Sequence, residues 1–174
     1  MIKEIPFEEA SKQLLEKLQH GGAFLTVKND EIVNTLTIGW AQIGYMWRHP
    51  VLTVMVRASR FSKEIIDGGD FFTVSVPGDA RPMAKQLTFF GTKSGRDCDK
   101  YAEGGLRLGA PETGDTPVAA DCELFFECKK AYTSPLDTGN LGVDINAENY
   151  QRGVNKGDLH TFYFGIINKV YRQE

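Results

Sequence analysis

Residues 51–68, VLTVMVRASRFSKEIIDG, predict a buried strand that runs almost directly into a helix. Every position in 51–56 is apolar or threonine, which is typical of a strand covered on both faces. After a short polar break, Ser62 is a good N-cap for a helix, and Phe61 can pack on Ile66 as a hydrophobic staple. Two glycines then end the helix. The stretch therefore leads the chain from the core to a helix N-terminus.

Basic and hydroxyl side chains gather at this predicted helix start, namely Arg57, Ser59, Arg60, Ser62 and Lys63. Free backbone N–H groups and the positive end of the helix dipole lie at the same place. Together they predict an anion site, for which a phosphate group is the natural ligand. The alternative is an exposed helix whose basic residues are simply solvated.

Composition narrows the class of protein. The chain has 174 residues, enough for one domain with a full core, and a net charge of −3 from 20 basic and 23 acidic residues. This balance does not favour a nucleic-acid or membrane-surface partner. The N-terminus lacks the apolar core of a secretory signal, and no apolar run approaches the ~20 residues of a membrane span. We therefore expect a cytoplasmic protein.

Neither cysteine nor histidine spacing suggests a metal centre. The three cysteines, Cys98, Cys122 and Cys128, form no Cys-x-x-Cys pair. Their odd number fits a reducing compartment. The three histidines are far apart in the sequence and form no zinc motif.

The remaining pattern predicts strands in meander order with a few short helices. A helix over 6–19 is expected to pack on the core, and Asp79 and the pair Ser94/Asp97 are expected to cap later helices. The predicted strands are 23–27 and 31–38, joined by a turn at Asn29-Asp30, then 51–56, 71–76, 122–130 and 158–171, while 41–50, 104–117 and 132–155 are predicted connections. Helices do not alternate regularly with strands, so an antiparallel barrel with peripheral helices fits better than a parallel sheet.

Three segments are candidates for a functional role. The segment NTLTIGW, residues 34–40, brings an amide, two hydroxyls, a glycine and a tryptophan together, although a strand with solvent-facing polar residues would look similar. The segment FGTKSGRDCDKY, residues 90–101, could hold an anion or a polar ring edge, but it lacks Walker spacing and also fits a plain helix–loop–helix connection. The long connection 132–155 is a candidate cover for a binding site.

Taken in order, NTLTIGW, RASRFSKEII and FGTKSGRDCDKY make the chain similar to the flavin reductase-like family, and within it to the flavoredoxin-like branch. The resemblance extends from about residue 22 to residue 170. It implies a mainly β architecture with peripheral helices, an antiparallel FMN-binding split β-barrel. We expect a single such domain over 1–174, with residues 1–20 as an N-terminal packing helix.

The resemblance also implies cofactor-binding roles at matching positions. The first motif would lie along the isoalloxazine ring, the second would hold the FMN phosphate, and the third would approach the ring or ribityl chain. The last strand would add two residues at the open ring face. The implied residues are Asn34, Thr35, Leu36, Thr37 and Trp40; Arg57, Ser59, Arg60 and Ser62; Lys93, Ser94, Gly95 and Asp97; and His160 and Phe164.

The implied activity is an FMN reductase-type oxidoreductase that binds FMN noncovalently and takes electrons from NADH, NADPH or a redox protein partner. The flavin carries the chemistry, so no catalytic side chain and no metal are expected. The family forms homodimers with the flavin near the subunit interface. Two alternatives remain open: a non-enzymatic FMN-carrying electron-transfer or storage protein, and a split-barrel relative that binds haem or a pyridoxal derivative. The final electron acceptor and the choice between NADH and NADPH are not encoded in these motifs.

Overall fold

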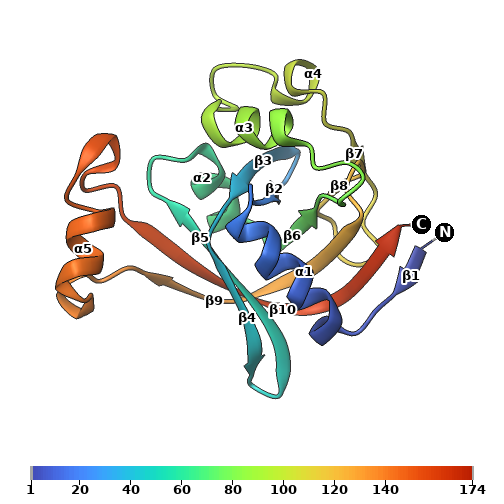
Figure 1. Ribbon diagram of the computed structural model, residues 1–174, viewed down its shortest axis with the longest axis horizontal. Coiled ribbons are helices and arrows are strands. Elements are labelled where there is room, and N and C mark those ends of the chain that lie inside the picture. Colours follow the sequence, from blue (N-terminus) through green and yellow to red (C-terminus); the bar gives the residue numbers. More distant parts are fainter. Residues whose placement is uncertain (1, 174) are drawn as a thin grey trace.

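The computed structural model describes residues 2–173 and consists mainly of antiparallel strands with helices at the periphery (Figure 1). The strands of the large sheet are β1 (Ile2–Glu4), β2 (Ala23–Asn29), β3 (Ile32–Ile38), β4 (Ala41–Met46), β5 (His49–Arg57), β6 (Phe71–Val76), β9 (Leu124–Pro135) and β10 (His160–Gln173). The helices are α1 (Phe7–Gln19), α2 (Phe61–Gly68), α3 (Ala84–Thr92), α4 (Lys100–Gly104) and α5 (Val143–Asn149). No helix within these residues is both long and apolar enough to cross a membrane.

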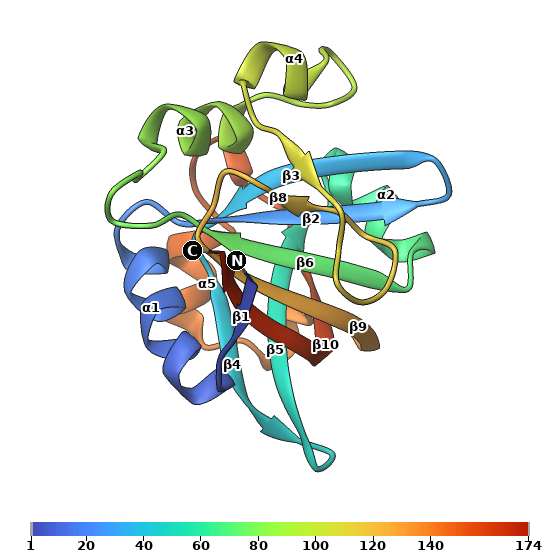
Figure 2. The same ribbon diagram turned by 90° about the vertical axis from the view of Figure 1, so that its right-hand side faces the viewer.

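The sheet follows the order β3-β2-β6-β9-β10-β5-β4, and β1 adds to β10. All of these pairs are antiparallel. A separate two-stranded ladder joins β7 (Leu108–Gly109) and β8 (Val118–Ala119). Strand β10 is the centre of the architecture, because it pairs with β9, β5 and β1 (Figures 1 and 2).

Close approach at the middle of β10 requires a glycine. A Cβ on Gly165 would lie 2.5 Å from the Phe72 ring and 2.7 Å from the Cys128 Cβ. The ladder with β9 also shifts register on both sides of this region, between Phe164 and Gly165 and between Ile167 and Lys169. Irregularities of this kind bend a strand and increase its twist. They let one long strand serve both halves of the curved sheet.

Both faces of β2, β5 and β6 are largely buried, which explains the continuous apolar runs of these strands. The main core lies inside the curve of the sheet and includes Leu14 of α1 and Ile66 of α2. A second core lies between the opposite face and α3, where Phe24 and Phe125 meet Phe90. Strand β9 contributes Leu124 and Phe126 to the main core and Phe125 to the second, so both faces of its first five residues are buried. The predicted half-buried strand at 122–130 is corrected accordingly, and even Glu127 is buried.

Two predicted connections contain regular structure. Segment 41–50 forms β4 and the start of β5, joined by a turn in which Trp47 and Arg48 have φ of 53° and 62°. Their positive φ values are those of a type I′ hairpin, which is usually built from Asn-Gly, and residues 41–50 contain no such pair. Segment 132–155 continues β9 to Pro135 and then forms α5 between two 3-10 turns. The three-residue β1 and the two-residue β7 and β8 were also not predicted.

The predicted helix caps were wrong. Arg60 occupies the N-cap of α2, so Ser62 is the second residue of the helix and is buried. Helix α3 starts after Met83, while the Asp79 carboxylate instead accepts a hydrogen bond from Lys17. Helix α4 is capped by Asp99, which accepts from the N–H groups of the second and third residues of the helix, and Ser94 and Asp97 lie in the preceding turn.

Candidate functional site

Two adjoining pockets lie between the start of α2, the end of β3 and the loop after α3. The basic pocket has a volume of about 560 Å³. Its lining is Asn34, Leu36, Ser59, Arg60, Phe61, Ser62, Gly91, Thr92, Lys93, Ser94, Arg96, Asp97, Lys100, Val154 and Asn155. The Trp40 pocket, about 170 Å³, is lined by Leu36, Thr37, Ile38, Gly39, Trp40, Met55, Arg57, Arg60 and His160. Leu36 and Arg60 belong to both linings, so the pockets adjoin.

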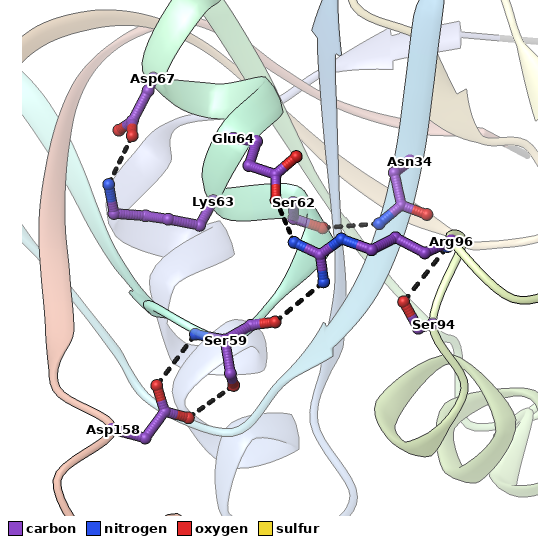
Figure 3. A network of polar contacts seen from close by, with 9 residues as sticks. All are labelled: Asn34, Ser59, Ser62, Lys63, Glu64, Asp67, Ser94, Arg96 and Asp158. Carbon is purple, nitrogen blue, oxygen red and sulfur yellow. Dashed lines mark hydrogen bonds and ion pairs between the residues drawn. The ribbon is translucent and has the colours of Figure 1, made fainter.

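The polar floor of the basic pocket is set by the contact between β3 and α2. The Asn34 amide donates to the Ser62 hydroxyl over 2.7 Å, and both side chains are buried (Figure 3). The Lys63 N–H donates to the Arg60 carbonyl over 2.9 Å, and the two N–H groups before it have no acceptor within the helix. The helix dipole places partial positive charge at the same point. Gly95 packs against this pair: a Cβ there would lie 2.6 Å from Asn34 Oδ1. The loop after α3 is thereby held close to the start of α2.

Four cationic side chains border the basic pocket, with Asp97 as the single acidic residue of its lining. Arg60 donates to the Gly91 carbonyl over 2.7 Å. Arg96 forms an ion pair with Glu64 and donates to the Ser59 carbonyl over 3.1 Å (Figure 3). Its guanidinium also lies 5.2 Å from the centroid of the Phe61 ring. Lys93 and Lys100 complete the set. The resulting field favours an anionic ligand.

Asp158 accepts hydrogen bonds from Ser59 and Arg57, which were predicted to bind a phosphate. Its carboxylate accepts from the Ser59 N–H over 2.9 Å and from the Ser59 hydroxyl over 2.6 Å (Figure 3). Its backbone carbonyl accepts from Arg57 over 2.7 Å. Asp158 therefore fixes the loop between β5 and α2 to the start of β10. Arg60, Ser62 and the first turn of α2 are left to face the basic pocket.

Around the Trp40 pocket, aromatic rings surround Arg57. Its guanidinium lies 5.9 Å from the Trp40 ring and 5.4 Å from the Tyr150 ring. His160 is 7% exposed, and its Nδ1 lies 2.7 Å from the Tyr150 hydroxyl. Burial, and secondarily Arg57, lowers the pKa of His160 to about 4, while burial raises the pKa of Tyr150. At neutral pH the imidazole is therefore neutral, and its Nδ1 shares one hydrogen bond with the Tyr150 phenol.

The structure brings most of the predicted site residues together at the two pockets. Twelve of them line one pocket or both: Asn34, Leu36, Thr37, Trp40, Arg57, Ser59, Arg60, Ser62, Lys93, Ser94, Asp97 and His160. Gly95 lies between them in the same loop. The Thr35 side chain turns away into the interior, where its hydroxyl contacts Thr26 and Tyr101. Phe164 packs instead with Trp47 and Tyr132.

Sequence reasoning missed Arg96, Lys100, Met55 and Gly91. Arg96 and Lys100 stand inside the quoted segment FGTKSGRDCDKY, so their charge was visible. Their direction depends on how α3 and α4 pack on β3, which no local pattern encodes. Met55 was hidden because an apolar residue in a core strand is normally buried. Within residues 2–173, no group of three His, Cys, Asp or Glu side chains could hold a metal ion.

No protein-family model matches the sequence, and no curated protein does either. Solved structures do match. An FMN-binding domain of a flavin reductase-like enzyme from Shewanella baltica has a TM-score of 0.65 and 19% identity, over 99% of this chain and 77% of that one. Flavoredoxin from Methanosarcina acetivorans has a TM-score of 0.65 and 22% identity, over 87% and 68%. Nitrilotriacetate monooxygenase component B from Bacillus cereus has a TM-score of 0.66 and 14% identity, over 100% and 82%.

At these identities the likeness concerns the fold. The chain has the fold of flavin reductase-like split-barrel proteins, which confirms the predicted class of an antiparallel β architecture with peripheral helices. It also supports, at the level of fold, the resemblance carried by the three sequence motifs.

Proposed function

We propose that this protein binds FMN noncovalently and moves reducing equivalents through it. The observation that carries the proposal is the direct junction of the basic pocket with the Trp40 pocket at Leu36 and Arg60. A flavin mononucleotide joins a phosphate to an apolar ring system by a short polar chain. The donors of the basic pocket suit the phosphate, and the wall from Thr37 to Trp40 suits the ring. The residues present therefore fit this cofactor.

In this assignment the phosphate accepts from Arg60, Ser62 and the N-terminal N–H groups of α2. Asn34 fixes the Ser62 hydroxyl from behind. Bound FMN supplies the hydride or electron transfer. The protein's part is to hold the ring, to exclude water from its covered face and to place Lys93 and neutral His160 near its edges. No side chain acts as a nucleophile.

The activity we propose is that of an NAD(P)H-dependent FMN reductase-type oxidoreductase. The sequence has no Gly-x-Gly-x-x-Gly fingerprint, so a nicotinamide would bind transiently over the flavin. Trp40 is 46% exposed, which supports access from solvent at that end of the site. A redox protein partner is the other donor compatible with an open ring edge.

A second candidate is an FMN-carrying electron-transfer protein without nicotinamide activity. The structural similarity to flavoredoxin supports it. Both candidates share the same FMN site and differ only in the electron donor. A homodimer belongs to either proposal, and the exposed rings of Tyr45, Trp47 and Tyr132 support a surface that a second copy of the chain covers. Either proposal also includes a cytoplasmic location, with which the three free cysteines agree.

One experiment separates these functions. The purified protein is incubated with FMN, freed of excess ligand and examined for the visible spectrum of bound oxidised flavin. The complex is then mixed anaerobically with NADH or NADPH in a stopped-flow instrument. Rapid bleaching supports the reductase, whereas a flavin that only dithionite reduces supports the electron carrier. A protein that retains no flavin would overturn both.

A further inference from the structure

Lys100 is a buried cation at the wall of the basic pocket. It begins α4, is 3% exposed and donates from Nζ to the carbonyls of Thr35 over 2.6 Å and Phe90 over 3.0 Å. Its Nζ also lies 4.9 Å from the Phe90 ring centroid. An ammonium group has three N–H donors, so these two carbonyls leave one without a carbonyl partner. Lys100 is also one of the residues that line the basic pocket.

The charge of Lys100 has no carboxylate to balance it. None of the ion pairs among residues 2–173 includes Lys100. The groups that face it are Arg60 from the start of α2, Cys98 from the preceding turn and the Tyr101 phenol beside Thr35. Burial, and secondarily Arg60, lowers its pKa to about 8. A buried ammonium without a counter-charge is costly, so a ligand that supplies negative charge is favoured there.

Resting on the proposed FMN site, we propose that Lys100 is a ligand-binding residue whose buried positive charge selects flavins that carry a phosphate and couples their binding to proton uptake. An anionic group in the basic pocket stabilises the ammonium form of Lys100. Where part of the free protein holds neutral Lys100, binding must take up a proton. Affinity for a phosphorylated flavin therefore falls as pH rises through about 8, the pKa of Lys100 in the free protein.

The phosphate itself does not titrate in this range, because a phosphate monoester has its second pKa at about 6. Two ligands isolate its contribution: FMN and riboflavin, which has the same ring without the phosphate. Dissociation constants are measured by flavin fluorescence between pH 7 and 9 for the wild type, Lys100→Met and Lys100→Arg. Circular dichroism and thermal unfolding establish that each variant is folded.

For the wild type we expect FMN affinity to fall about tenfold from pH 7 to pH 9, while riboflavin affinity changes little. Lys100→Met should weaken FMN binding at pH 7 by about tenfold or more and flatten its pH profile. Lys100→Arg keeps the charge throughout, so its FMN affinity should stay flat to pH 9. The Lys100→Arg variant tests the role of the charge even if Lys100→Met fails to fold, because arginine retains a cation at the pocket wall.

Two outcomes would overturn the role of Lys100 and leave the proposed function standing. One is an FMN affinity and pH profile unchanged in Lys100→Met. The other is an equal loss for FMN and riboflavin, which would make Lys100 a structural link between β3 and α3. A wild-type protein that binds neither ligand would overturn the proposed function itself.

Discussion

At the scale of single residues, Arg60 and Arg57 are separated by the structure although the sequence placed them in one phosphate site. Arg60 lines both pockets, whereas Arg57 lines only the Trp40 pocket and donates to the Asp158 carbonyl. Removing Arg60 should therefore affect the phosphate more than removing Arg57.

We expect Arg60→Ala to weaken FMN binding by about 10- to 100-fold, because it removes a charge-assisted hydrogen bond to phosphate. Arg57→Ala should cost less for FMN and affect riboflavin comparably, since this residue contacts the ring end. Fluorescence titration of both ligands measures the difference. Arg81→Ala is the matched control, because this exposed guanidinium pairs with Asp121 outside both pockets. Equal FMN affinity in Arg60→Ala and wild type would refute the phosphate assignment.

His160 gives the stability of the protein a defined pH dependence. Its folded-state pKa of about 4 lies below the ordinary 6.5, so the unfolded chain takes up this proton first as pH falls. The free energy of unfolding should therefore decrease between pH 6.5 and 4. Arg57 and Arg60 oppose protonation and Asp158 favours it.

The test is urea unfolding of the wild type and His160→Asn at pH 7 and pH 4.5. The asparagine keeps a partner for the Tyr150 hydroxyl but does not titrate. We expect the wild type to lose on the order of 2 kcal/mol more than the variant over this interval. If the free energy of unfolding changed equally with pH in both proteins, the lowered pKa of His160 in the folded state would be contradicted.

The sequence motifs predicted several side chains that line the pockets, among them Arg60, Ser62 and Asn34. The orientation of the side chains was not predictable. The Thr35 hydroxyl faces the interior because β3 alternates its side chains and Thr35 pairs with Thr26 of β2. Ser59 is saturated by Asp158, which is distant in sequence.

At the scale of elements, the loop between α3 and α4 closes the basic pocket by packing on the start of α2. Gly95 makes this possible, because an added Cβ would lie 2.6 Å from Asn34 Oδ1 and 3.0 Å from the Phe61 ring. Asn34 cannot yield freely, since its amide donates to Ser62.

Gly95→Ala should therefore displace this loop, cost about 1–3 kcal/mol of stability and weaken FMN binding. Gly44→Ala is the matched control, because no heavy atom lies within 4 Å of its added Cβ and its backbone is not left-handed. Thermal unfolding and FMN titration of both variants give the comparison. A Gly95→Ala protein that matches Gly44→Ala in both measurements would contradict the close packing.

Strands with strong apolar runs were predicted well, as for β5 and β6, because burial on both faces leaves a clear pattern. The starts of α2, α3 and α4 and the structure of segment 132–155 were not predicted. Arg60 caps α2, Asp99 caps α4, and α5 has no buried residue. An element with so little core contact leaves almost no periodic pattern to detect.

At the scale of the whole molecule, the β4–β5 hairpin extends away from the helices (Figure 1). It carries exposed aromatic rings. The hairpin patch consists of four aromatic residues and one methionine, namely Tyr45, Met46, Trp47, Tyr132 and Phe164. The ring centroids of Trp47 and Tyr132 lie 6.4 Å apart. Tyr45 is 66% and Trp47 51% exposed. Such a contiguous patch indicates an interface, and our proposal assigns it to a second copy of the chain.

Light scattering after gel filtration should give a wild-type mass of twice the 19.4 kDa chain. Replacing Tyr45 and Trp47 together by serine should shift the protein towards monomer, because it removes most of the exposed aromatic surface of the hairpin. Ile32→Ser is the control, since Ile32 is an equally exposed apolar residue at the β2–β3 turn. A wild-type protein that is monomeric at all micromolar concentrations would contradict the assignment.

The crystal structure of the protein with FMN tests the central claim most directly. Our account predicts the phosphate within hydrogen-bond distance of the Arg60 guanidinium and the Ser62 hydroxyl, with the isoalloxazine ring against Thr37–Trp40. FMN bound in another cleft, with the basic pocket free of phosphate, would contradict it.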